Sequence, residues 1–279
     1  MHHRLNTLFF WALVPAFGLV PSQGAWAQDA NILTGCSSES PPFVITKDGI
    51  GQSGFSVELM RRVAQQIGQE ADIRELPWAR CLNEVQAGRI DVAVDAFEDA
   101  ERRKKFYYTS PYYTLTPQIF YPTRRRGPGL PATTVADLKG FRGCGIHGYT
   151  YEHYGLDEKQ LDLGAKSNKQ MITMLLANRC DYAVEELEYI MGGRSIEKDW
   201  PDETSLSSFT PQWAIRPKLH LLVGRSHRRA VKLVANLNNA LAELEKSGTT
   251  RQLRQQYFPE ASNPAKGDLK SSSKAPVPP

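Results

Sequence analysis

The sequence lacks the features that would place it directly in several common classes of protein. After residue 27, no segment approaches the roughly 18 uncharged apolar residues that a membrane-spanning helix needs. No Ser-His-Asp order, phosphate-binding glycine loop or recognisable set of metal ligands is present. Charges of both signs are mixed along the chain, and no long basic face carries interleaved aromatic residues. We therefore expect no metal, no cofactor and no nucleic-acid partner.

The first 27 residues have the organisation of a secretory signal peptide. Arg4 precedes an apolar stretch at residues 8–20, and Ala25-Trp26-Ala27 provides small residues at the alternate positions that signal peptidase accepts. The apolar stretch is too short to span a bilayer. We predict cleavage after Ala27 and export of a soluble protein to the periplasm.

The sequence has only four cysteines, and all of them remain in the exported chain. An even number of cysteines in an oxidising compartment favours disulfide bonds. Two lie in each half of the chain, so pairing within each half fits the order of the expected elements best. The predicted disulfides are Cys36 with Cys81 and Cys144 with Cys180.

Two other interpretations of the cysteines are open. Leu33-Thr34-Gly35-Cys36 looks like a lipoprotein cleavage box, in which Cys36 would be acylated, but cleavage there would delete an expected strand. A metal site could use Cys144 and Cys180 with His147 and His153. Strand alternation places Cys144 and His147 on opposite faces, which disfavours this site.

The first half of the mature chain alternates strands and helices. The expected order is a strand at 32–34, a helix after residue 54, a strand at 73–77, a helix at 81–85 and a strand at 90–94. This order predicts a parallel sheet with helices on both faces. The loop at 97–105 then follows the carboxyl end of a strand, where open α/β sheets bind ligands. It begins with Phe97 and Glu98, ends in four basic residues and leads into an aromatic run.

Several motifs resemble those of the bacterial extracellular solute-binding proteins, family 3, which serve polar amino-acid ABC transporters in the periplasm. Thr109-Ser110-Pro111-Tyr112 is similar to that family's F-S-x-P-Y segment, with Arg103 seven residues before Ser110. Pro41-Pro42-Phe43 and the segment at 54–59 resemble its P-P-F and G-F-x-x-D-L motifs. Residues 148–152 resemble the G-S-T-x-E element that opens a helix in the second half.

The resemblance implies a ligand site built from both halves of the chain. Arg103, rather than Arg102, would clamp a ligand carboxylate with two parallel hydrogen bonds. Thr150, at a helix start that favours anions, would contact the same carboxylate, and Glu186 would pair with a ligand ammonium. The candidate ligand-binding residues are Trp78, Phe97, Glu98, Arg103, Tyr149, Thr150 and Glu186.

Each assignment has a purely structural alternative. The basic residues at 102–105 are also compatible with a solvated face, and Trp78 with core packing. Thr150 is compatible with a helix cap and Glu186 with a surface carboxylate.

The implied fold is an α/β, two-lobed periplasmic binding protein of type II, with a hinge of two crossing segments near 116–121 and 216–223. The first lobe comprises residues 28–118 and 219–260, and the second comprises residues 119–218. Residues 261–279 are rich in Ser, Lys and Pro and are expected to be disordered.

The predicted function is capture of an amino acid or related small polar solute by lobe closure. A monomer without enzymatic activity would then hand the solute to an ABC permease of the inner membrane. Glu98 replaces a residue that is usually Ser or Thr, and its carboxylate would repel a ligand carboxylate unless it turns away or pairs with Arg102. This favours a cationic, amide or other polar solute over a standard α-amino acid.

Two alternatives from other classes are open. One is an enzyme like the periplasmic cyclohexadienyl dehydratases, which share the scaffold, with Glu98 or Glu186 as general acid or base. The other is a soluble adaptor that senses a solute.

Overall fold

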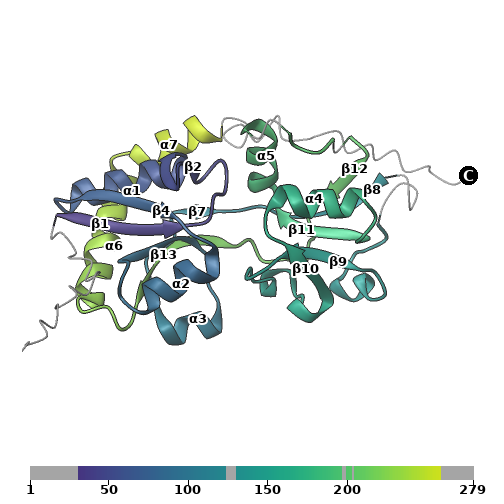
Figure 1. Ribbon diagram of the computed structural model, residues 1–279, viewed down its shortest axis with the longest axis horizontal. Helices are drawn as coiled ribbons and strands as arrows, with labels where there is room; N and C mark the ends of the chain where they lie inside the picture. Colours follow the sequence, from purple (N-terminus) through teal and green to yellow (C-terminus); the bar gives the residue numbers. More distant parts are fainter. Residues whose placement is uncertain (1–30, 124–129, 197–198, 203, 259–279) are drawn as a thin grey trace, which may run out of the picture.

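The computed structural model describes residues 31–123, 130–196, 199–202 and 204–258. It is a two-lobed α/β protein in which each lobe has its own sheet and helices (Figure 1). The predicted signal peptide and the predicted disordered tail lie outside the described residues. Within those described ranges, no helix is long and apolar enough to cross a membrane.

The first lobe is built on an eight-stranded mixed sheet. Its strands are β1 (Ile32–Ser37), β2 (Ile45–Lys47), β3 (Ile50–Ser53), β4 (Glu70–Glu75), β5 (Val92–Ala96), β6 (Phe106–Tyr108), β7 (Tyr113–Thr114) and β13 (Lys218–Gly224). They run in the order β2-β3-β4-β1-β5-β13-β6, and β7 also pairs with β13. The predicted parallel arrangement of β1, β4 and β5 is confirmed, and the other pairings of this sheet are antiparallel.

Helices cover both faces of this sheet, as the alternation of apolar residues predicted. Val92 and Val94 point into the larger core, which includes residues of α1 (Phe55–Gln66), α6 (Ala230–Lys246) and α7 (Thr249–Tyr257). Ala93 and Ala96 point to the opposite face and pack against Val85 of α2 (Trp78–Gln86). The central strands are therefore buried on both sides, which is typical of parallel strands in α/β proteins.

The second lobe has a five-stranded sheet in the order β10-β9-β11-β8-β12. Its strands are β8 (Pro117–Pro122), β9 (Gly143–Ile146), β10 (Leu161–Ala165), β11 (Tyr182–Glu186) and β12 (Leu206–Phe209). The first three in that order are parallel, and β8 and β12 are antiparallel additions. The helices of this lobe are α4 (Asn168–Leu176) and α5 (Leu187–Ile196), with short 3-10 helices at Val135–Leu138, Glu152–Tyr154 and Glu158–Gln160.

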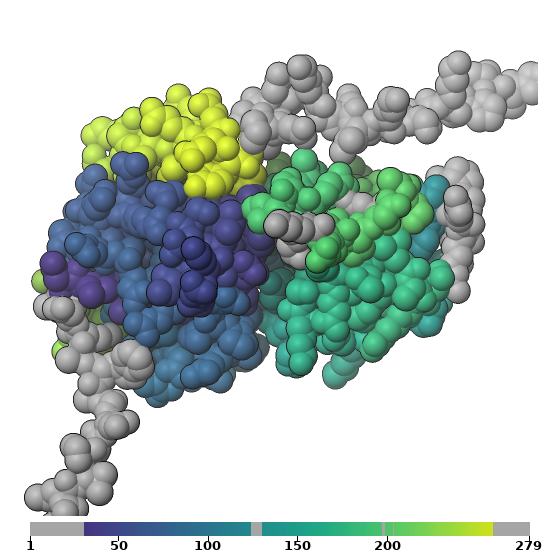
Figure 2. Space-filling view, turned by 45° about the horizontal axis from the view of Figure 1, so that its top comes forward, coloured from purple at the N-terminus to yellow at the C-terminus, as the bar shows by residue number. Residues whose placement is uncertain are grey.

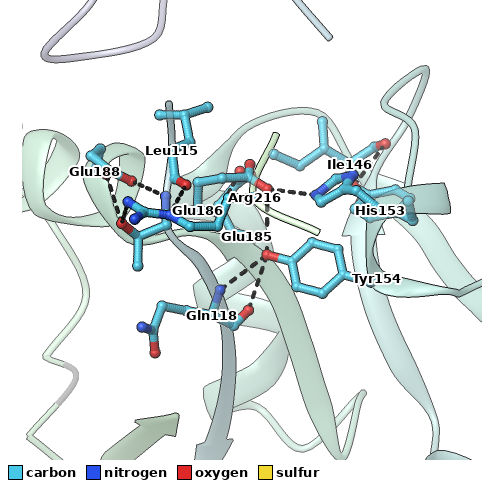
Figure 3. Close-up of polar contacts among 11 residues, drawn as sticks. Leu115, Gln118, Ile146, His153, Tyr154, Glu185, Glu186, Glu188 and Arg216 are labelled. Atoms are coloured by element: carbon cyan, nitrogen blue, oxygen red, sulfur yellow. Dashed lines mark hydrogen bonds and ion pairs between the residues drawn. The ribbon is translucent and has the colours of Figure 1, made fainter. Parts of the chain in front are cut away.

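The chain passes between the two sheets twice, once between β7 and β8 and once between β12 and β13. The predicted lobe boundary at 118/119 falls inside β8, which belongs wholly to the second sheet. Arg216 in the second crossing donates to Leu115 O and Thr116 Oγ1 in the first, each at 3.1 Å. The carboxylate of Glu188 accepts from the N–H and hydroxyl of Thr116 (Figure 3). The two crossings are thus tied to each other and to α5.

The four cysteines form the two predicted disulfides. Cys36–Cys81 joins β1 to α2, and Cys144–Cys180 joins β9 to the residue two before β11. The lipoprotein interpretation of Cys36 and the metal interpretation of Cys144 and Cys180 are therefore wrong, because these thiols are used in disulfides.

Two local predictions near the cleft are wrong. Residues 100–105 were expected as loop but form α3 (Ala100–Lys105), because Asp99 caps the helix by accepting from the N–H groups of Glu101 and Arg102. Residues 148–152 were expected to open a helix, but only the 3-10 turn Glu152–Tyr154 forms. Gly155 ends it in the left-handed conformation (φ 71°).

Candidate ligand-binding site

A cavity lies between the two lobes and is lined by residues of both. The first lobe lines it with Ser37, Ser38, Ser40, Trp78, Asp95, Phe97 and Arg102, and the second lobe with Tyr149, Thr150 and Tyr189. Most of the first-lobe residues follow or end a strand at the carboxyl edge of the sheet, the place where α/β sheets bind ligands. Four of the seven predicted ligand-binding residues line the cavity, namely Trp78, Phe97, Tyr149 and Thr150.

Arg102, and not Arg103, faces this cavity. The side chain of Arg102 is only 12% exposed, its guanidinium lies 5.7 Å from the centre of the Trp78 ring, and its Nη2 donates to Gly148 O of the second lobe at 3.3 Å. Arg103 is 58% exposed and forms an ion pair with Glu98. The structure therefore places Arg102 at the cavity and the predicted Arg103 outside it.

The sequence also allows an alignment of the family motif that points to Arg102. If F-S-x-P-Y is aligned on Pro111 and Tyr112, its serine falls on Thr109 rather than Ser110, and the residue seven before Thr109 is Arg102. Glu98 does not line the cavity, because its carboxylate is paired with Arg103 on the outside. The repulsion expected between Glu98 and a ligand carboxylate therefore does not arise.

Asp95, near the end of β5, was not among the predicted residues. Its Oδ1 accepts hydrogen bonds from the hydroxyls of Ser56 and Tyr112, and its own N–H donates to the Tyr112 oxygen. Its Oδ2 is buried and has no hydrogen-bond partner among the described residues. Burial raises the pKa of Asp95 to about 6, because the two hydroxyl donors only partly offset the cost of a buried charge. A carboxylate in a strand that is otherwise apolar was the available sequence signal.

Glu186, at the end of β11, does not line the cavity either. Its side chain is 3% exposed, and its Oε1 lies 2.8 Å from His153 Nε2 and 3.4 Å from the Tyr154 hydroxyl (Figure 3). Burial raises the pKa of Glu186, but the bond to His153 and the other hydrogen bonds outweigh it and bring the pKa below its usual value. The neighbouring Glu185 has a buried Oε2 without a partner in the described chain, and burial raises its pKa well above the usual range.

The two lobes touch each other along their boundary (Figure 2). The rings of Phe97 and His153 meet edge to face at 5.4 Å, and those of Phe43 and Tyr189 lie 5.1 Å apart. Gly192 of α5 packs so closely on the Pro41–Pro42 backbone that a Cβ atom would not fit. The structure therefore represents a closed arrangement of the lobes.

Comparison with known proteins agrees with this architecture. The L-cystine-binding protein TcyJ of Escherichia coli K12 is 26% identical over 235 residues, which cover 81% of this chain and 82% of that protein. The probable amino-acid-binding protein YxeM of Bacillus subtilis is 26% identical over 238 residues, covering 84% and 86%.

A solved structure of a mutant of the T. maritima protein ArgBP superposes with a TM-score of 0.67 at 20% identity, covering 82% of this chain and 96% of that one. The family model described as bacterial extracellular solute-binding proteins, family 3, matches residues 32–260. Because this match spans most of the chain and the fold has the two lobes and the cavity expected of such a protein, the chain belongs to the bacterial extracellular solute-binding proteins of family 3.

Proposed function

We propose that this protein captures an amino acid or a related small polar solute in the cavity between its lobes. The closed form then delivers the solute to an ABC permease of the inner membrane, and the protein acts in the periplasm as a monomer without a cofactor. The observation that carries the proposal is the position of Arg102, a largely buried guanidinium that lines the cavity and reaches across to the second lobe.

Arg102 suits a carboxylate ligand. A guanidinium has five N–H donors in a planar fork, and one of those of Arg102 is used in a hydrogen bond within the described chain. Thr150 lines the same cavity from the second lobe and adds a hydroxyl donor. A carboxylate held between these two residues would contact both lobes at once, so its binding would stabilise the closed arrangement.

The remaining walls suit the body of a small solute. Trp78, Phe97, Tyr149 and Tyr189 supply aromatic surface, and Ser37, Ser38 and Ser40 supply hydroxyls. The relatives TcyJ and YxeM are named as binders of cystine and, probably, an amino acid, which are small polar molecules that such walls could contact.

We propose binding rather than catalysis because neither carboxylate offered as a general acid or base lines the cavity. Glu98 is exposed and paired with Arg103, and Glu186 is held by His153. A general acid or base must lie within hydrogen-bond reach of the group it protonates or deprotonates. Incubation with prephenate or arogenate should leave both unchanged, and formation of product would contradict the proposal.

The main test is ligand binding by the Arg102→Ala variant. A thermal-shift screen of the common amino acids, cystine and simple organic acids should find a stabilising ligand, because binding to the folded state alone raises stability. Arg102→Ala should weaken binding of the best ligand by about 30-fold to 5000-fold in calorimetric titration, since loss of a buried charged partner costs about 2–5 kcal/mol. Arg103→Ala is the matched control and should bind like the wild type. Equal loss in both variants, or loss only in Arg103→Ala, would contradict the assignment.

A further inference from the structure

We infer that Asp95 receives an ammonium group of the solute, so that the cavity is selective for zwitterionic or cationic amines over acids that carry only a carboxylate. This inference rests on the proposed function and narrows it to a class of solute. It assigns the cation-binding role to the first lobe, whereas the sequence predicted that role for Glu186 in the second lobe.

The hydrogen-bond pattern of Asp95 leaves one side of its carboxylate without a partner. Oδ1 accepts from both Ser56 and Tyr112, the latter at 2.8 Å. Oδ2 accepts nothing from the described residues, although it is buried and the residue lines the cavity. Leaving a buried charged acceptor unsatisfied is costly, and native structures normally satisfy such atoms with a partner. A donor that enters before the lobes close would provide that partner.

The backbone fixes the orientation of this side chain. Asp95 has φ 65°, in the left-handed region that non-glycine residues rarely adopt, and its N–H is held by the Tyr112 oxygen at 2.9 Å. Backbone conformations of this kind cluster at ligand sites, where surrounding contacts maintain them. The carboxylate is therefore pre-oriented before a ligand arrives.

No cationic side chain neutralises Asp95 within the described part of the chain. Burial raises the pKa of Asp95 to about 6, because its two hydroxyl donors offset the effect of burial only in part. The cation that does line the cavity, Arg102, has Asp99, Gly148 O and the Trp78 ring as its neighbours and forms no ion pair with Asp95 among the described residues. The charge of Asp95 thus calls for either a proton or a cation from outside the protein.

The surroundings of Tyr149 indicate that the wider cavity is acidic. Burial is the main cause that raises the pKa of its phenol, and the nearby charges of Glu185, Glu186 and Asp95 raise it further. Glu186 is compensated by His153, whereas Glu185 and Asp95 each have an oxygen without a partner among the described residues. A cationic group near Asp95 would be favoured by the field of those carboxylates that are ionised.

Aromatic side chains surround the same space. Trp78, Phe97, Tyr149 and Tyr189 all line the cavity, and the faces of aromatic rings attract ammonium groups. A primary ammonium would satisfy Oδ2 with a hydrogen bond and contact these rings. A quaternary ammonium would contact the rings but leave Oδ2 without a hydrogen bond, so primary amines fit better.

The test uses sets of probes that differ only in their charged groups. Each set contains an L-amino acid, the α-hydroxy acid that replaces its ammonium with a hydroxyl, and the amine that lacks its carboxylate. Alanine with lactate and ethylamine, phenylalanine with phenyllactate and phenethylamine, and arginine with argininic acid and agmatine are suitable sets. Titration calorimetry at pH 7.5 measures the affinity of the wild type and of Asp95→Asn for each probe. Asn keeps the shape and tolerates the left-handed backbone.

We expect the wild type to bind the best amino acid at least tenfold more tightly than its hydroxy acid. Asp95→Asn should lower that preference at least tenfold. Its affinity for the hydroxy acid should stay within threefold of the wild-type affinity. Glu186→Gln, the control in the second lobe, should keep the preference.

The outcomes separate the two proposals. If the hydroxy acid binds as well as the amino acid, or if Asp95→Asn keeps the preference, the inference is overturned, while loss of binding in Arg102→Ala would still support the proposed function. If loss of the preference occurs in Glu186→Gln and not in Asp95→Asn, the ammonium site lies in the second lobe and the inference is wrong. If no probe, cystine included, binds the wild type, the proposed function fails and the inference fails with it.

Discussion

Burial of the Asp95 side chain should make the stability of the whole protein depend on pH. Its carboxylate is pre-oriented by Ser56 and Tyr112 and faces a cavity whose other charged side chain is Arg102. Tyr149 and Tyr189 from the second lobe also face this region, and their pKa values are raised by burial, so they stay neutral at ordinary pH. Ionisation of Asp95 in the empty protein is therefore opposed by burial.

The stability of the empty protein should consequently depend on pH through Asp95. The pKa of Asp95 in the folded state is about 6 against an ordinary value of 3.8, so the folded state holds this proton more tightly than the unfolded state. The Asp95 contribution is therefore most favourable below pH 4 and is lost as the pH rises to about 6. The upper limit of the change is about 3 kcal/mol, from a shift of about two pKa units.

Urea unfolding of the wild type and of Asp95→Asn at pH 4, 5, 6, 7 and 8 measures this effect. The free energy of unfolding of the wild type should fall relative to that of the variant between pH 4 and pH 6, and the difference should be constant above pH 7. Glu185 contributes to the pH dependence in the same direction, but equally in both proteins, so the difference isolates Asp95. If the difference in free energy of unfolding between the two proteins does not change with pH, the raised pKa of Asp95 is contradicted.

At the scale of single elements, the helix α3 decides which arginine reaches the cavity. Successive residues of a helix point about 100° apart, so Arg102 and Arg103 cannot both face inward. Asp99 starts the helix by accepting from the N–H groups of Glu101 and Arg102 at 2.7 and 3.0 Å. The other carboxylate oxygen of Asp99 lies 3.7 Å from Arg102 Nε, so one residue both caps α3 and orients the arginine.

The two roles of Asp99 can be separated by substitution. Asp99→Asn should keep the cap, because Asn is as good an N-cap as Asp, and should lose only the ion pair. Asp99→Ala loses both, and the loss of a cap costs about 1 kcal/mol of helix stability. We expect calorimetric affinity for the best ligand to fall about twofold to threefold in Asp99→Asn and about tenfold in Asp99→Ala. Glu101→Ala, which changes an exposed carboxylate of the same helix, should bind like the wild type. The same affinity in all three variants would contradict a positioning role for Asp99.

At the scale of the whole molecule, closure depends on how closely the second lobe approaches the first. The two crossings are linked through Arg216, Thr116 and Glu188, so movement at the hinge and movement of α5 are coupled (Figure 3). Further along α5, Gly192 packs on the backbone of Pro41–Pro42 in the first lobe. This contact joins the two lobes in the arrangement that the structure shows.

Gly192→Val should therefore hold the lobes apart. Its side chain would occupy the space that Pro41 fills in the closed form, while valine has a higher helix propensity than glycine and should not destabilise α5. We expect at least a tenfold loss of affinity and a radius of gyration, measured by small-angle X-ray scattering, that no longer decreases when ligand is added. Ser195→Val on an exposed part of the same helix is the control and should behave like the wild type. Compaction and affinity equal to those of the wild type in Gly192→Val would show that this contact does not govern closure.

The sequence by itself determined the fold class, the main order of strands and helices, both disulfides and four side chains of the cavity. These features follow from local information. Apolar residues repeat with the period of the strand or helix they belong to, and the carboxyl ends of parallel strands share one edge of a sheet. Trp78, Phe97, Tyr149 and Thr150 lie at or just beyond such ends, so their positions along the chain already indicated the cavity.

Only the tertiary structure decided which charged groups line the cavity. Arg102 replaces the predicted Arg103 because the position of Asp99 sets where α3 begins, and one residue of helical rotation separates the cavity from solvent. Glu186 does not line the cavity, and its carboxylate is instead in contact with His153 from a different segment of the chain. Asp95 gains its role because Ser56 and Tyr112 satisfy one of its oxygens and leave the other without a partner in the described chain. Whether a charge is free or compensated depends on contacts between residues far apart in sequence, and local patterns do not encode those contacts.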